Sequence, residues 1–217
     1  ILNKNQPFVK LFINIIFLIL LGSFGFSKEK YPDIWDKLMN HKEWEYVKET
    51  EKYQLFKSTF DKYSIPAFKI EMILKAHPQT ILDVAWNVSE YPESLPSAYI
   101  TQAGIFQNQD STQIAWQIMD IPFMALRLYQ YQHVRKQNRV DWYNTVFKQH
   151  LEDNVIIAST NVGSWRISKK GEKNILTYIV LTDPGGLVPA WIVKQAQMKY
   201  LPQMLMEAED TALKLLK

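Results

Sequence analysis

Histidine can ligate a metal or move a proton near neutral pH, so the histidines of this sequence are its first candidates for chemistry. They are His41, His77, His133 and His150, no two stand at metal-ligand spacing, and no HExxH motif occurs. A histidine–carboxylate site assembled across strands would lack such spacing, but we expect no metal site and no catalytic residue. The chain contains no cysteine, which excludes disulfides, thiolate metal sites and cysteine nucleophiles. No G-x-S-x-G, P-loop or dinucleotide-binding glycine pattern is present.

Two charged residues stand next to conspicuous motifs. Asp183 precedes Pro184-Gly185-Gly186 and could be a catalytic carboxylate, but aspartate is a favoured first residue of tight turns, so we prefer a structural role. Arg166 follows Trp165 and could bind a ligand headgroup, yet neighbouring residues of a strand point to opposite faces. We predict that Trp165 is packed and Arg166 is solvated, because arginine is rarely buried without a partner.

A third candidate is the segment from Arg127 to Val134, which alternates like a strand. Arg127, Tyr129, Tyr131 and His133 fall on one of its faces. On a concave face they would hold the polar end of an amphiphile, and on a convex face they would meet solvent. The sequence leaves both alternatives open.

The elements that must position these residues are a sheet and a long helix. Val155–Ile167 and Asn174–Thr182 have the β-branched, apolar character of strands. Pro184 and Gly185 suit the two central positions of a type II turn, after which Leu187–Lys217 is predicted to be helical. Its expected apolar stripe comprises Val188, Trp191, Ile192, Gln195, Met198, Leu201, Leu205, Met206, Ala212 and Leu213.

The upstream segments are predicted from alternation and turn residues. In Phe68–Lys75 the apolar residues alternate with polar ones, which is typical of a half-buried strand. Asp120–Leu126 is apolar but contains Pro122, so it is expected to be a loop. The other expected elements are helices Asp33–His41 and His77–Asn87 and strands Trp44–Val47, Tyr53–Phe60, Ala98–Gln107, Gln113–Met119, Arg127–Gln137 and Asp141–Gln149.

The order Gly163-Ser164-Trp165-Arg166, followed by Thr177-Tyr178-Ile179-Val180-Leu181-Thr182-Asp183-Pro184-Gly185-Gly186-Leu187-Val188-Pro189-Ala190-Trp191-Ile192-Val193, closely resembles the C-terminal part of a START domain. START domains are lipid-transfer modules related to steroidogenic acute regulatory protein. The resemblance covers roughly residues 35 to 216. It implies an α+β helix-grip (START/Bet v1-like) fold, in which a curved antiparallel sheet wraps around a long C-terminal α-helix and encloses a hydrophobic cavity.

The N-terminus predicts export. Leu11–Leu21 is apolar except for Asn14, lysines precede it, and small residues follow. This pattern is typical of a signal peptide, and the stretch is short for a membrane span. We expect residues 1–27 to be a signal peptide and residues 28–217 to be the START-like domain, as in a secreted bacterial protein. Cleavage could follow Gly25 or Ser27. The expected location is periplasmic or secreted, with an uncleaved membrane anchor as the alternative.

These inferences predict a protein that binds a hydrophobic ligand, a lipid by the resemblance, and carries or transfers it as a monomer that contacts membranes transiently. The alternative is a cyclase- or hydrolase-like enzyme on the same scaffold; we expect no enzyme and no cofactor. The net charge of +3 is scattered, so no nucleic-acid partner is expected. The expected ligand-binding residues are Phe123, Met124, Arg127, Tyr129, Val188, Trp191, Ile192 and Gln195.

Overall fold

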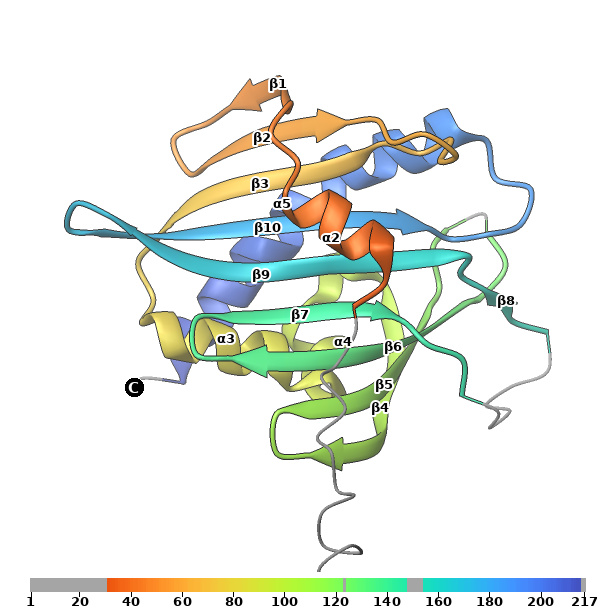
Figure 1. Ribbon diagram of the computed structural model, residues 1–217. Coiled ribbons are helices and arrows are strands. Elements are labelled where there is room, and N and C mark those ends of the chain that lie inside the picture. Colours follow the sequence, from red (N-terminus) through yellow and green to blue (C-terminus); the bar gives the residue numbers. More distant parts are fainter. Residues whose placement is uncertain (1–30, 123, 148–153, 216–217) are drawn as a thin grey trace, which may run out of the picture. The chain divides into compact units, whose positions relative to one another are not determined.

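The computed structural model describes residues 31–122, 124–147 and 154–215 (Figure 1). The chain divides into two compact units, Ile1–Tyr31 and Pro32–Lys217, and the second unit contains the helices and strands given below. The expected leader, residues 1–27, lies outside the described residues, and so does Phe123. In the described ranges no helix is both long and apolar enough to cross a membrane.

Ten strands of the described chain form one curved sheet in the order β1-β2-β3-β10-β9-β7-β6-β5-β4, with β8 beside β6 (Figure 1). Neighbouring strands are antiparallel except for β6 and β8, which are parallel. The strands are β1 Glu45–Glu49, β2 Tyr53–Ser58, β3 Ala67–Leu74, β4 Ile100–Gln109, β5 Thr112–Met119, β6 Arg127–Lys136, β7 Arg139–Asn144, β8 Ile156–Ile157, β9 Thr160–Lys170 and β10 Lys173–Asp183.

The strands differ in how many of their faces are covered. In β3 the alternation predicted from the sequence is confirmed, because Phe68, Ile70 and Met72 are buried while Lys69 and Glu71 are partly exposed. In β10, by contrast, the residues from 178 to 181 are buried without interruption. Helix α2 (Asp33–Met39) packs on β9 and β10, and α5 (Ala190–Lys214) lies on the other side of the sheet (Figure 1). A strand covered on both faces reads as a continuous apolar run.

Helix α3 (Pro78–Trp86) begins and packs as the sequence predicts. Pro78 occupies the first turn, and the ring nitrogen Nδ1 of His77 accepts a hydrogen bond from the backbone N–H of Gln79 at 3.2 Å. Ile81, Leu82 and Ala85 face the core. The short helices η1 (Val88–Glu90), α4 (Tyr91–Ser94) and η2 (Pro96–Ala98) then lead the chain to β4.

Three predicted elements require correction. The segment 155–167 is not a single strand, because Ala158 and Ser159 separate β8 from β9. Helix α5 begins at Ala190, three residues later than expected, because Gly185 and Gly186 both have positive φ and Pro189 is still extended. The hairpin turn after β6 lies at residues 137–138, so β7 also starts earlier than predicted.

The buried face of α5 also differs from the predicted stripe. Its buried residues are Val193, Gln197, Pro202, Met204, Leu205, Ala208 and Ala212, whereas Trp191 is 68% exposed. Leu205 and Ala212 were predicted correctly, and the predicted Met198, Leu201, Met206 and Leu213 are partly buried against the core, but the first two turns present a different side to the sheet. The small residues Ala208 and Ala212 let the helix approach its neighbours, whereas the predicted stripe favoured the largest apolar side chains.

Candidate ligand-binding cavity

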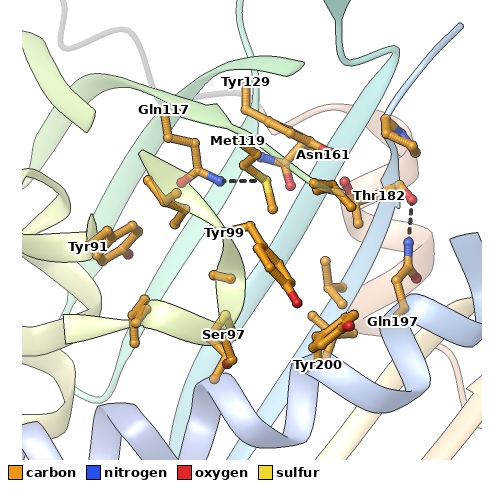
Figure 2. A pocket seen from close by; sticks show the side chains of 18 of the residues that line it. Tyr91, Ser97, Tyr99, Gln117, Met119, Tyr129, Asn161, Thr182, Gln197 and Tyr200 are labelled. Atoms are coloured by element: carbon orange, nitrogen blue, oxygen red, sulfur yellow. Dashed lines mark hydrogen bonds between the residues drawn. The ribbon is translucent and has the colours of Figure 1, made fainter. Parts of the chain in front are cut away.

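A cavity of about 160 Å³ lies between the concave face of the sheet and α5 (Figure 2). Side chains from η2, β4, β5, β6, β7, β9, β10 and the first half of α5 line it. Side chains from elements far apart in the sequence therefore meet around one partly open cavity, as expected when a helix is laid across a curved sheet. The volume is large enough for several water molecules or for part of an organic ligand.

Aromatic side chains make up much of the wall. The rings of Trp142 and Tyr178 stack with centroids 5.5 Å apart, and Trp165 meets Tyr178 edge to face at 5.0 Å. Gly163 makes this packing possible: a Cβ there would lie 2.2 Å from Cζ2 of Trp142 and 2.4 Å from the carbonyl oxygen of Ile179. The glycine is therefore required by close approach of the indole, and its φ is not positive.

Uncharged polar groups interrupt the apolar lining. Tyr131 donates its hydroxyl proton to Oε1 of Gln117 at 3.0 Å, and the indole Nε1 of Trp142 donates to Oδ1 of Asn161 at 2.9 Å. On the α5 side, Nε2 of Gln197 donates to the backbone carbonyl of Thr182 at 3.0 Å (Figure 2). These bonds fix the orientation of several polar side chains before any ligand arrives.

The buried tyrosines of the cavity remain protonated at neutral pH. Burial raises the pKa of Tyr129 to about 12, although a hydrogen bond with Thr182 and the charge of Arg127 oppose the shift. Burial also raises the pKa of Tyr131 and Tyr178 well above the ordinary value. Their hydroxyls therefore act as neutral hydrogen-bonding groups, because a phenolate would lose its hydration in this space.

His133 is the one titratable imidazole in the described cavity wall. Burial lowers its pKa to about 3, and its Nδ1 lies 3.1 Å from Nε2 of Gln113, a nitrogen that can only donate. The ring is therefore neutral, with its proton on Nε2. Among the described lining residues there is no aspartate, glutamate, lysine or arginine, so the cavity wall carries no formal charge near neutral pH.

At the α5 side of the cavity, Tyr99 and Tyr200 form a polar pair. Their rings meet edge to face at 5.1 Å (Figure 2), and their hydroxyls are hydrogen-bonded. Tyr99 has a φ of 57°, which is uncommon for a residue other than glycine. Both side chains are partly exposed and line the cavity.

Only some of the predicted ligand-binding residues line the cavity. Met124 and Tyr129 line the cavity, and Tyr129, Tyr131 and His133 show that the polar face of β6 is the concave one. Arg127 is 2% exposed and donates from a terminal nitrogen to the carbonyl of Ala125 at 2.5 Å, but it is not part of the lining. Ligand contact by these residues stays a prediction.

The four residues predicted on α5 and before it do not border the cavity in this structure. Trp191 and Gln195 are exposed, and Val188 and Ile192 are partly exposed. In their place the helix presents Val193, Ala196, Gln197, Tyr200, Leu201 and Met204. The sequence signal that could have found part of this face is the pair of small residues Ala208 and Ala212, which are four residues apart and mark the side of the helix that can lie close to its neighbours.

Trp165 is buried in the cavity wall, as predicted, and Arg166 lies on the opposite face. Arg166 is only partly exposed rather than solvated, since its Nε donates to Oγ of Ser164 at 3.2 Å and its guanidinium lies 5.8 Å from the ring of Trp35. Asp183 serves the turn, since its Oδ1 accepts the backbone N–H of Gly185 at 2.9 Å. Within the described ranges no cluster of three or more histidine, aspartate or glutamate side chains is arranged to hold a metal ion.

Solved structures share this architecture at low sequence identity. A STAR-related lipid transfer protein from Xanthomonas axonopodis has a TM-score of 0.69 and 16% identity, covering 78% of this chain and 98% of its own. Human STARD10 has a TM-score of 0.71 and 14% identity, covering 88% and 83%. This chain has the START fold. The predicted α+β helix-grip architecture is therefore confirmed. No family model and no curated protein sequence matches the chain.

The expectation that the chain is no enzyme has to be withdrawn. The Zhui aromatase/cyclase from Streptomyces sp. R1128 has a TM-score of 0.50 and 12% identity, covering 70% of this chain and 95% of its own. The START fold thus also occurs in enzymes. A sequence without a recognisable catalytic motif does not exclude that class, because residues of a curved sheet can meet in a cavity without any fixed spacing.

Proposed function

We propose that the START-like domain binds one hydrophobic ligand, a lipid, in the cavity under α5 and carries it between membranes. The observation that carries this proposal is the largely apolar, aromatic-walled cavity between the sheet and the helix. The similar structures support it, because several of them are described as lipid transfer proteins.

The first test is the content of the purified protein. We expect detergent-free preparations to release one main lipid species on organic extraction, identified by mass spectrometry. Ala196→Phe should fill part of the cavity and reduce the extracted amount, because Ala196 lines it. Gln195→Phe is the matched control, because Gln195 lies on the exposed side of the same helix. A preparation that contains no lipid and binds none from a broad panel would refute the proposal.

We further propose that the edge around Gly186 meets the membrane while the lipid enters. Leu187 is fully exposed and Trp191 is 68% exposed, and both follow the turn in the sequence. Ile157 is also exposed, and its backbone carbonyl oxygen lies beside Gly185. Three exposed apolar residues therefore flank this turn. Exposed apolar groups at one edge favour contact with lipid. Trp191→Ser should slow transfer between vesicles while leaving the amount of bound lipid unchanged. Transfer at the wild-type rate would argue against this edge.

Export through the leader is proposed on the pattern of residues 1–27 alone. N-terminal sequencing of the mature protein should find a start after Gly25 or Ser27. An intact leader in a membrane fraction would favour the anchored form.

An enzyme with a cyclic or cyclising substrate is the second candidate. The aromatic walls and His133, whose ring reaches the cavity, favour it. A pKa of about 3 makes His133 a weak base, but its Nε2–H can donate a hydrogen bond to a carbonyl oxygen. Conversion of a bound ligand to a new mass, lost in His133→Gln while binding persists, would support this candidate.

A further inference from the structure

Gln197 is a buried polar residue on the helix face that covers the cavity. It is 8% exposed and belongs to the cavity lining. Its orientation is fixed, because Nε2 lies 3.0 Å from the backbone carbonyl oxygen of Thr182, which can only accept a hydrogen bond. The remaining atom of the amide, Oε1, is therefore left as an acceptor.

This acceptor has no donor within the described chain. Of the described cavity-lining side chains, only Gln197 keeps a buried nitrogen or oxygen atom without a hydrogen-bond partner. A buried acceptor without a partner costs free energy, so such groups are normally satisfied. Because the Gln197 side chain borders the cavity, the cavity is where a missing donor can come from.

The electrostatics of the cavity restrict what that donor can belong to. The described lining has no charged side chain, and its buried Tyr129, Tyr131, Tyr178 and His133 are neutral. A carboxylate or phosphate placed here would lose its hydration and find no charged side chain in the described lining, since the buried Arg127, whose charge acts on Tyr129, does not border the cavity. A hydroxyl group, in contrast, brings a proton for Oε1 and adds no charge. Tyr129, Asn161 and Thr182 provide further neutral polar groups in the same wall (Figure 2).

We propose that the cavity selects an uncharged ligand that carries a hydroxyl group, and that Oε1 of Gln197 accepts the hydroxyl proton. This inference rests on the proposed function and specifies its ligand class. It also assigns a recognition role to a residue outside the set predicted from the sequence. An ionised lipid is disfavoured, because its charge would have to stay outside the enclosed part of the cavity.

Two matched sets of probes test the proposal by equilibrium dialysis. One set is 2-naphthol, 2-methoxynaphthalene and 2-naphthoate; the other is 1-dodecanol, dodecyl methyl ether and dodecanoate. Within a set the hydrocarbon is constant, whereas the donor and the charge change. We expect the alcohol to bind about tenfold more tightly than the ether, because only the alcohol satisfies the acceptor, and more tightly than the acid.

Gln197→Met should remove the difference between alcohol and ether, because the thioether keeps the volume and loses the amide oxygen. Gln195→Met, on the exposed side of the helix, should keep the difference. If Gln197→Met does not fold, the order in which the wild-type protein binds alcohol, ether and acid still tests the hydroxyl proposal.

Equal binding of alcohol and ether, or preference for the acid, overturns the hydroxyl inference and leaves hydrophobic binding standing. Binding of no probe from either set also overturns it. That result counts against the proposed function as well only if the detergent-free extract contains no lipid.

Discussion

The buried His133 predicts that acid destabilises this domain well above the pH at which carboxylates titrate. Its ring lies near Trp86, Tyr131 and Trp142, and burial lowers its pKa to about 3, whereas an unfolded histidine has a pKa of about 6.5. Between these values the unfolded chain binds a proton that the folded chain does not. The stability that the neutral ring contributes is therefore fully present above pH 6.5. Below this pH the free energy of unfolding falls by about 1.4 kcal/mol for each unit of pH.

From pH 7 to pH 5 the expected loss is about 2 kcal/mol of unfolding free energy, from the same proton linkage. Urea denaturation at both pH values measures it, and His133→Gln provides the reference because glutamine does not titrate. The side-chain oxygen of the new glutamine can still accept the hydrogen bond from Gln113. The wild-type protein should lose about 2 kcal/mol more than the variant. Equal losses would show that His133 is protonated in the folded state and would refute the reasoning.

Gly163→Ala should lower the free energy of unfolding by about 3 kcal/mol, because its Cβ would lie 2.4 Å from a main-chain carbonyl oxygen; a neutral effect in urea denaturation would contradict this packing. Leu205→Ala, at a fully buried site, should cost about 3 kcal/mol, whereas Trp191→Ala should change stability by less than about 0.5 kcal/mol. The reverse order would mean that the helix buries its other face. Hydrogen exchange at Met124 and Leu187 should slow when ligand binds; identical protection in both states would argue against entry at this edge.

The fold could be predicted because its signals are local. Alternation in β3, the helix start at His77 and Pro78 and the proline–glycine turn after Asp183 each depend on a few adjacent residues, and each was found where expected. Element ends were less predictable. The start of α5 depends on two successive glycines with positive φ, and the break between β8 and β9 depends on the pairing of β8 with β6, which lies well upstream in the sequence.

The residues of the cavity wall could be predicted only on strands, where alternation determines which side chains share a face. Period-two alternation places Tyr129, Tyr131 and His133 on one face whatever surrounds them, so a single question remained, namely which face is concave. The structure answers it, since all three border the cavity. On α5 the sequence does not determine which face of the helix turns towards the sheet, because Trp191, Ile192 and Met198 form a plausible apolar stripe of their own.

The helix face that the structure buries was hidden by its composition. Beside Val193 and Met204 it contains alanine and the polar Gln197, so it has fewer large apolar side chains than the predicted stripe although it covers the cavity. A purely structural helix would gain stability from a large apolar side chain at such a site, because burying an amide with an unsatisfied oxygen costs free energy. A ligand that supplies the missing donor removes this cost, and small neighbours leave the space the ligand needs. The features that concealed this face from pattern analysis are therefore those expected of a surface shaped to hold a ligand.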